Sequence, residues 1–193
     1  VNVGIAVCYP DISSSGSKKI EIFKTTDGGV TWLAKGGSLL TNSKPNQIPR
    51  YIKDDLGDFF WFGSSDGEII KTNDKGTTWT VTQTPYTTSH YELDSKSLGH
   101  FAIIDANTAY FTDFNTGKLY KTTDGFLTEQ YVGDPGLGRQ TYLERIPSTN
   151  ILIAVSGSYN PGTSRGSKYS TDGGLTWVLI SNIGRMFVKS KGI

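Results

Sequence analysis

Apolar residues along this chain fall in short runs separated by glycine, proline, asparagine, serine and aspartate, without the 3.6-residue period of an amphipathic helix. The runs IEIFK (20–24), GEIIK (67–71), GKLYK (117–121) and GSKY (166–169) are typical of strands. Each is followed, after a polar turn, by a second run, for example VTWLA (30–34), TTWTVTQ (77–83) or LTWVLI (175–180). The pattern predicts a series of β-hairpins and almost no helix.

The polar turn of each hairpin is a variant of one motif, which we call the box. The four copies are KTTDGGVTW (24–32), KTNDKGTTW (71–79), KTTDGFLTE (121–129) and YSTDGGLTW (169–177). Their aspartates, Asp27, Asp74, Asp124 and Asp172, are separated by 47, 50 and 48 residues. A constant spacing of this size indicates a repeated structural unit.

Two further strand-like runs precede the later boxes. They are RYIKDD and DFFWFGS, HFAIID and TAYFTD, and YLERIP and ILIAVSGS. Each repeat therefore predicts four antiparallel strands, and such a unit cannot bury its own faces. The repeat length fits a blade of a β-propeller better than a helical solenoid, so the predicted fold class is all-β, a propeller of four-stranded blades.

The box has a structural explanation that requires no catalysis. A hydroxyl and a carboxylate, as in Thr25 and Asp27, can accept backbone N–H bonds, and Gly29 allows an unusual backbone angle. Trp32 can pack its ring between neighbouring blades. We assign the same structural role to Thr72, Asp74, Gly76 and Trp79, to Thr122 and Asp124, and to Ser170, Asp172, Gly174 and Trp177. Trp32, Trp79 and Trp177 are expected to be largely buried.

The pattern Ser/Thr-x-Asp-x-Gly-x-Thr-Trp resembles the Asp-box of bacterial sialidase-type repeats. That motif also occurs in sortilin-like receptors, in some glycoside hydrolases and in propellers similar to the photosystem II assembly factor. The third copy departs from it, with Phe126 in place of glycine and Glu129 in place of tryptophan. We therefore expect a looser turn there, an exposed Glu129 and the least stable blade of the four.

The segments RIPSTNILIAVSGS, GSKYSTDGGLTW and IGRMFVKSKGI extend the resemblance to photosystem II assembly factor-like propellers and to secreted Bacteroidetes proteins built from the same repeats. This resemblance implies a non-catalytic, secreted or cell-surface module that binds a protein or glycan. The alternative is a sialidase-type glycoside hydrolase, because Arg145-Ile146-Pro147 is similar to the Arg-Ile-Pro motif of sialidases. No second catalytic motif accompanies it, so no catalytic residue is assigned.

Composition adds few constraints. Nineteen basic and eighteen acidic residues give a net charge of +1, and no charge run suggests nucleic acid as a partner. No apolar stretch is long enough to cross a membrane. Cys8 is the only cysteine and is expected to be buried, and no metal or cofactor site is predicted.

The position of the boxes sets the phase of the repeats, which are approximately 1–48, 49–98, 99–140 and 141–184, with a new blade beginning at 185–193. In this phase VNVGIAVCY is a second strand, so the first blade lacks its inner strand. We treat residues 1–193 as one propeller domain or a fragment of one. The first blade is completed either by the last strand of a closed ring of four or by the remainder of a larger propeller, and we favour the latter.

Binding residues are expected in the loops opposite the boxes, where tyrosine, histidine and arginine suit sugar stacking and acid recognition. The candidates are Arg50, Tyr86, His90, Tyr91, Tyr142, Arg145, Tyr159 and Arg185. Alignment of the inner strands by their turns predicts Arg50 and Arg185 at one position and Arg145 two residues later, all on one strand face.

Overall fold

The computed structural model of the chain describes residues 2–8, 20–35, 49–56, 58–64, 67–84, 98–156 and 166–182. For residues 49–56, 64 and 98 it describes the backbone alone. All regular secondary structure in these ranges is β-strand, so the predicted all-β class is confirmed. No helix of the described residues is long and apolar enough to span a membrane.

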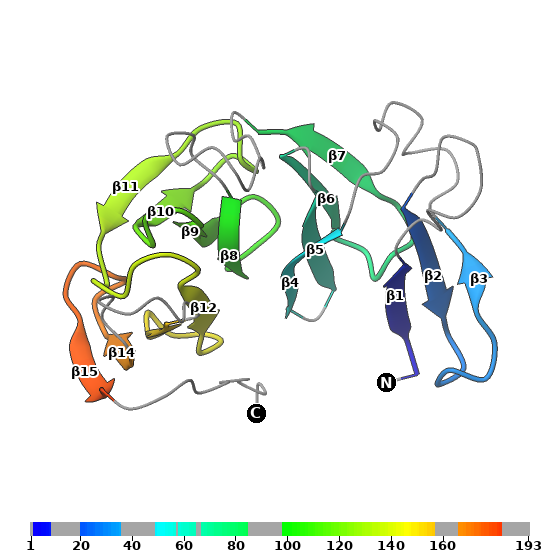
Figure 1. The fold of residues 1–193 in the computed structure, drawn as a ribbon. Helices are drawn as coiled ribbons and strands as arrows, with labels where there is room; N and C mark the ends of the chain where they lie inside the picture. Colours follow the sequence, from blue (N-terminus) through cyan, green and yellow to red (C-terminus); the bar gives the residue numbers. More distant parts are fainter. Residues whose placement is uncertain are drawn as a thin grey trace, which may run out of the picture. The chain divides into compact units, whose positions relative to one another are not determined.

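The strands form four antiparallel sheets, numbered here in chain order (Figure 1). Sheet 1 contains β1 (Gly4–Cys8), β2 (Glu21–Thr25) and β3 (Leu33–Ala34). Sheet 2 contains β4 (Pro49–Leu56), β5 (Phe59–Ser64), β6 (Glu68–Thr72) and β7 (Thr80–Gln83). Sheet 3 contains β8 (Leu98–Ile103), β9 (Ala109–Asp113), β10 (Leu119–Thr122) and β11 (Gln130–Gly133). Sheet 4 contains β12 (Tyr142–Arg145), β13 (Leu152–Val155), β14 (Ser167–Ser170) and β15 (Val178–Ser181).

Each box joins the last two strands of its sheet, as the sequence predicts. In sheets 2, 3 and 4 two strands precede that hairpin, whereas in sheet 1 the described residues supply only β1. In the order of the strands, β1 corresponds to β5, β9 and β13. Cys8, at the end of β1, is exposed, contrary to expectation.

The chain divides into two compact units, Val1–Pro85 and Tyr86–Ile193, and each is described by itself. The core of the first unit joins Ile20 and Ile22 of sheet 1 to Phe62, Ile70 and Trp79 of sheet 2. The Trp79 ring meets the Phe62 ring edge-on, with centroids 6.1 Å apart. Burial of such large side chains contributes about 1.5–3 kcal/mol each, so the two sheets stabilise one another.

The second unit repeats this arrangement. Tyr110 and Leu119 of sheet 3 pack with Leu143 and Leu152 of sheet 4, and Trp177 lies partly buried against them. In each unit, the box glycine of the second sheet lets side chains of the first sheet approach the box closely. A Cβ at Gly76 would lie 3.0 Å from Ile5 Cδ1, and one at Gly174 would overlap Leu119.

The three box tryptophans differ in burial, which corrects the expectation that all three are largely buried. Trp79 is 5% exposed and Trp177 is half-buried, but Trp32 is 44% exposed. A Cβ built on Gly29 would meet no residue other than Trp32 itself within 4 Å. Within the unit Val1–Pro85, sheet 2 packs on the opposite side of sheet 1, against Ile5, Val7 and Ile22.

The third box is closed in the same way as the others, so the expected looser turn is not found. Phe126 N–H donates to Thr122 Oγ1 over 2.9 Å, and Thr128 N–H donates to Asp124 over 2.9 Å. Phe126 has a φ of 76°. This left-handed conformation costs a residue with a side chain about 1–2 kcal/mol.

The side chain of Phe126 explains why that conformation is tolerated. It is buried, with its ring centroid 5.0 Å from that of Phe111 and 5.9 Å from that of Phe101. Glu129 is half-buried rather than exposed, and burial raises the pKa of its carboxyl. The third box therefore supplies its buried aromatic ring from the glycine position instead of the tryptophan position.

Candidate functional site

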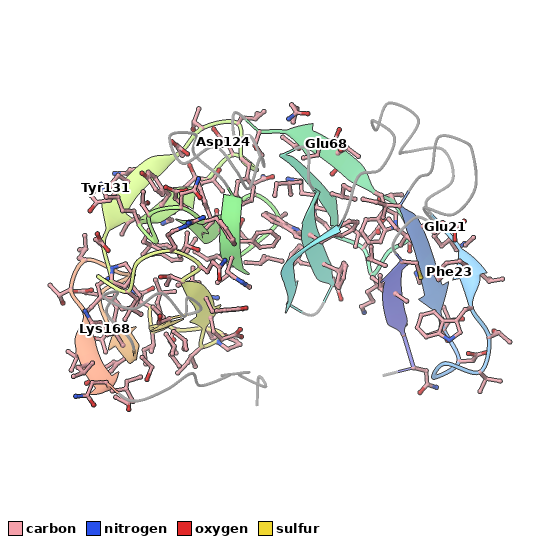
Figure 2. The ribbon with its side chains drawn as sticks, in the orientation of Figure 1. Glu21, Phe23, Glu68, Asp124, Tyr131 and Lys168 are labelled. Carbon is pink, nitrogen blue, oxygen red and sulfur yellow. The ribbon has the colours of Figure 1, made fainter. Side chains whose placement is uncertain are left out.

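The box residues form a repeated hydrogen-bonded turn. In the first box, Thr25 Oγ1 accepts the Gly29 N–H over 2.9 Å, and the Thr25 hydroxyl donates to Asp27 over 2.7 Å. Asp27 also accepts the Thr31 N–H and hydroxyl, over 2.9 and 2.6 Å. The same set of bonds is present around Asp74, Asp124 and Asp172, and Asp124 is labelled in Figure 2.

These bonds stabilise the ionised aspartates. The Thr31 and Thr128 hydroxyls, with backbone N–H groups, lower the pKa of Asp27 and Asp124 to about 2. Burial raises the pKa of Asp74, but bonds from Thr78, Thr72 and Thr77 outweigh it and lower the pKa to about 2. The Thr176 hydroxyl holds the pKa of Asp172 well below its ordinary value. A glycosidase acid requires a raised pKa, so these carboxylates are unsuited to that role.

Only two of the eight candidate binding residues have described side chains, Tyr142 and Arg145. Arg50 is described by its backbone alone, within β4. Tyr86, His90, Tyr91, Tyr159 and Arg185 lie outside the described residues. No group of three or more histidine, cysteine, aspartate or glutamate residues in the described ranges is placed to hold a metal ion.

Arg145 ends β12 and takes part in the turn that follows. Its Nε donates to the Thr149 carbonyl over 3.0 Å, and Thr149 Oγ1 donates to the Ile146 carbonyl over 2.8 Å. Strand register corrects the predicted alignment. Arg145 pairs with Leu152, and Asp55 occupies the same place in sheet 2, where it pairs with Phe60. Asp55 is therefore the residue equivalent to Arg145, whereas the sequence alignment placed the equivalent position two residues after Arg50.

Tyr142, at the start of β12, stacks with His100 of β8. Their ring centroids are 4.0 Å apart and their planes are inclined by 38°. β8 and β12 are the first strands of sheets 3 and 4 and lie beside each other. Tyr142 is 37% exposed and His100 is half-buried, so the stacked pair presents part of its surface to solvent. We call this pair the aromatic platform.

The aromatic platform is electrically neutral at neutral pH. Burial lowers the pKa of His100 to about 4, so its imidazole carries no charge near pH 7. Tyr142 and Arg145 are three residues apart on an uninterrupted strand, and side chains alternate between the faces of a strand. The structure therefore places Arg145 on the opposite face of β12 and does not bring the two candidates into one site.

Backbone and hydroxyl groups hold the platform in place. His100 N–H donates to Thr112 Oγ1 over 3.1 Å, and the Thr112 hydroxyl donates to the Thr141 carbonyl over 2.9 Å. Gln140, in the left-handed region with a φ of 58°, donates its N–H to the Phe114 carbonyl over 2.9 Å. The strand that carries Tyr142 is thereby tied to β9 and to the turn after it.

The loop before Tyr142 is also tied to sheet 4. Lys168 of β14, labelled in Figure 2, donates from Nζ to the Pro135 carbonyl over 2.6 Å. A rigid support of this kind favours a defined contact surface. His100 is not among the residues predicted from the sequence. It nevertheless occupies the same position in β8 that Tyr142 occupies in β12, directly before an apolar residue.

No family model and no curated protein matches the chain. Among solved structures it is similar to YCF48 bound to a D1 peptide, with 16% identity and a TM-score of 0.51 over 92% of this chain and 57% of that one. It is also similar to YCF48 from Cyanidioschyzon merolae, with 15% identity and a TM-score of 0.55 over 90% of this chain and 54% of that one. A GH74 enzyme of Niastella koreensis gives 18% identity and a TM-score of 0.58, over 93% of this chain and 28% of the enzyme.

The chain thus spans a little over half the length of either YCF48 structure and less of the GH74 enzyme. Likeness at this level of identity establishes the fold. The four sheets are blades of a β-propeller, and the predicted resemblance to photosystem II assembly factor-like and sialidase-type repeat propellers is confirmed at the level of fold. Because propellers with this fold include enzymes and non-enzymes, the fold does not decide the activity.

Proposed function

We propose that the chain is a non-catalytic propeller module, secreted or displayed at the cell surface, that binds a protein or a glycan. The aromatic platform is the observation that carries this proposal. Two stacked rings on adjacent first strands offer apolar area, with a phenol and an imidazole at the edge for hydrogen bonds. The extracellular location rests on the resemblance of the sequence to secreted propeller proteins.

The state of the described titratable groups favours binding over hydrolysis. His100 is uncharged at neutral pH, the box aspartates are engaged as hydrogen-bond acceptors, and the Arg145 Nε is used by its own turn. Sialoside hydrolysis would instead require several arginines around one carboxylate and an activated nucleophile. A sialidase is therefore the weaker alternative.

A neutral platform suits ligands with both apolar and polar surface. The C–H face of a sugar ring, or an aromatic or proline side chain of a peptide, can lie flat on the exposed phenol ring. Hydroxyl or amide groups of the same ligand can then bond to the ring edges. Such contacts do not depend on ligand charge, so binding should persist in moderate salt.

The test is a screen of the purified chain against panels of immobilised glycans and extracellular protein fragments, followed by titration of each positive ligand. Tyr142→Ala should weaken binding at least about tenfold, because it removes half of the platform. Tyr131→Ala is the matched control, since Tyr131 is an exposed tyrosine on the outer strand β11 (Figure 2). Equal binding by both variants would reject the platform as the contact surface.

Catalysis is tested separately with a fluorogenic sialoside. We expect no turnover by the chain. Turnover that disappears in Arg145→Ala, while Tyr131→Ala retains it, would reject the non-catalytic proposal in favour of the sialidase alternative.

A further inference from the structure

Three of the four boxes place a glycine directly after the central aspartate. The pairs are Asp27–Gly28, Asp124–Gly125 and Asp172–Gly173, whereas the second box has Lys75 at the glycine position. The φ angles of the three glycines are 77°, 74° and 74°, in the left-handed region that glycine adopts without a steric penalty. The shape of the turn therefore favours an Asp–Gly pair at this point of the box.

An aspartate that precedes glycine is chemically vulnerable, because no side chain hinders the backbone nitrogen of the glycine. This nitrogen attacks the carboxyl carbon Cγ of the aspartate when the carboxyl is protonated. An N–Cγ bond forms, the nitrogen loses its proton, and one carboxyl oxygen leaves as water, which closes a succinimide ring. Water then opens the ring. Opening at Cγ restores aspartate, and opening at the backbone carbonyl carbon leaves isoaspartate, in which the main chain runs through the side chain.

The folded box keeps the carboxyl in its ionised, unreactive form. An ionised carboxylate resists a nucleophile and has no oxygen that can leave as water. The Thr31 hydroxyl and N–H, together with the Thr25 hydroxyl, lower the pKa of Asp27 to about 2. The third box lowers the pKa of Asp124 to about 2 through its own threonines (Figure 2). Hardly any of either carboxyl is therefore protonated at neutral pH.

The box also engages the nitrogen that would attack. In each of the three boxes the glycine N–H donates to a carbonyl two residues before β1, β9 or β13. The bonds run from Gly28 to Asn2 over 2.8 Å, from Gly125 to Asn107 over 2.8 Å and from Gly173 to Asn150 over 3.2 Å. The nitrogen must give up this bond before it can turn towards the carboxyl.

The position of the carboxyl group is fixed as well. Asp27 Oδ1 accepts the Thr31 N–H over 2.9 Å, and its Oδ2 accepts the Thr31 hydroxyl over 2.6 Å. The corresponding bonds hold Asp124 and Asp172. Rotation of Cγ towards the nitrogen of the next residue breaks both bonds, so ring closure requires local opening of the box.

We propose that the three Asp–Gly boxes are latent sites of isoaspartate formation, at which the hydrogen bonds of the folded turn suppress the reaction. Isoaspartate adds one carbon atom to the main chain, so a converted turn can no longer make the same set of bonds. A box that opens and reacts is therefore not restored by refolding. The proposal is independent of the ligand of the aromatic platform.

Prolonged incubation of the chain at neutral pH, followed by peptide mapping with fragmentation that distinguishes isoaspartate from aspartate, tests the proposal. Isoaspartate should form at the three boxes at least about tenfold more slowly in buffer than in guanidinium chloride, because the folded box must first open. In guanidinium chloride, Asp66–Gly67, which belongs to no box, gives the reference rate. Asp74–Lys75 should react slowly under both conditions, since the lysine side chain hinders its nitrogen.

Single substitutions show whether the bonds of each box protect it. Thr31→Val should accelerate isoaspartate formation at Asp27 at least about fivefold, because a hydrogen bond to a charged group is lost. Asp124 and Asp172 in the same chain are the controls and should react as before. Thr31→Ser, which keeps the hydroxyl, should restore the slow rate at Asp27. Thr128→Val should act in the same way on Asp124 alone. Both threonines are exposed, and circular dichroism establishes that the variants are folded.

Three results would overturn the proposal. The first is isoaspartate formation at the boxes that is as fast in buffer as in guanidinium chloride. The second is an unchanged rate at Asp27 in Thr31→Val and at Asp124 in Thr128→Val, which would show that the threonine hydroxyls do not protect the aspartates. The third is equal acceleration at all three boxes by either substitution, which would assign the protection to the stability of the whole fold.

Discussion

The hydroxyl of the first threonine or serine in each box makes two hydrogen bonds that hold the turn together. Thr72 is buried, and its Oγ1 accepts the Gly76 N–H over 2.9 Å while the hydroxyl donates to Asp74 over 2.7 Å. A single side chain therefore closes the turn and orients the carboxylate that holds the other end. Gly76 is itself buried, so its N–H is shielded from water.

Thr72→Val tests this role. The substitution keeps the shape but leaves the buried Gly76 N–H without its acceptor, so the free energy of unfolding should fall by about 1–3 kcal/mol. Urea denaturation followed by fluorescence measures the change. Thr80→Val is the control, because Thr80 is exposed on β7, and it should change stability by less than about 0.5 kcal/mol. An equal effect of both substitutions would show that the Thr72 hydroxyl is dispensable.

His100 makes stability depend on pH. Its pKa in the folded chain is about 4, below the ordinary value of 6.5, because of burial. Between these values the unfolded chain binds a proton that the folded chain excludes, so stability falls as the pH is lowered from about 6.5 towards 4. His100→Gln should reduce this slope, measured by urea denaturation at pH 7, 5.5 and 4.5. An unchanged slope would contradict the depressed pKa.

The box aspartates act in a lower pH range. Their pKa values lie below the unfolded value, so the stability they provide is fully present above about pH 4 and is lost as the pH falls through about 2. The contributions of His100 and of the boxes are therefore separable by pH. A midpoint near 4 for the His100 imidazole in an NMR titration would assign the upper range to this residue.

At the scale of the element, the third blade shows that the aromatic ring of a box can come from a different position of the motif. Phe126 supplies a buried ring, as Trp79 does in the second box, and Glu129 occupies the tryptophan position. The backbone hydrogen bonds are unchanged because they depend on Thr122, Asp124 and Thr128. The replacement of glycine by Phe126 therefore compensates for the replacement of tryptophan by Glu129.

A double substitution tests this complementarity. Phe126→Gly should lower the free energy of unfolding by about 2–4 kcal/mol, because loss of the ring outweighs relief of the positive φ. Adding Glu129→Trp should restore much of the loss by providing a ring from the position used in the other boxes. Urea denaturation of the single and double variants measures the coupling. Additive effects would show that the two positions do not share a role.

Across the whole molecule, the same motif residue has different energetic roles in different blades. Trp79 lies in the core that joins sheets 1 and 2, whereas Trp32 is 44% exposed. The difference comes from the neighbouring sheet and not from the box, since each box makes the same backbone bonds.

Alanine substitutions should reveal this difference. At low protein concentration, Trp79→Ala should reduce the free energy of unfolding by about 3–5 kcal/mol, because it opens a cavity between two sheets. Trp32→Ala should cost less than about 1.5 kcal/mol, since much of the ring is already in water. Acrylamide quenching should reach Trp32 but not Trp79. Equal losses of stability would indicate that Trp32 is covered in the folded chain.

The sequence by itself determined the strands, their antiparallel order and the position of every box. These features are local, because alternation of apolar residues and hydrogen bonds between residues two to four apart, such as Thr25 to Gly29, form within one hairpin. The same locality explains why the first box alone is enough to predict that β1 is followed by the β2–β3 hairpin.

Only the tertiary structure decided which box tryptophan is buried, how Phe126 replaces one, and that His100 stacks on Tyr142. Each of these depends on residues brought together from separate strands or separate sheets, as His100 and Tyr142 are. Burial of a side chain is a property of what covers it. The repeats encode nearly identical local structure, so they carry little information about which sheet packs on each face. The sheet that packs on a face determines how exposed each of its side chains is and how much its burial stabilises the fold.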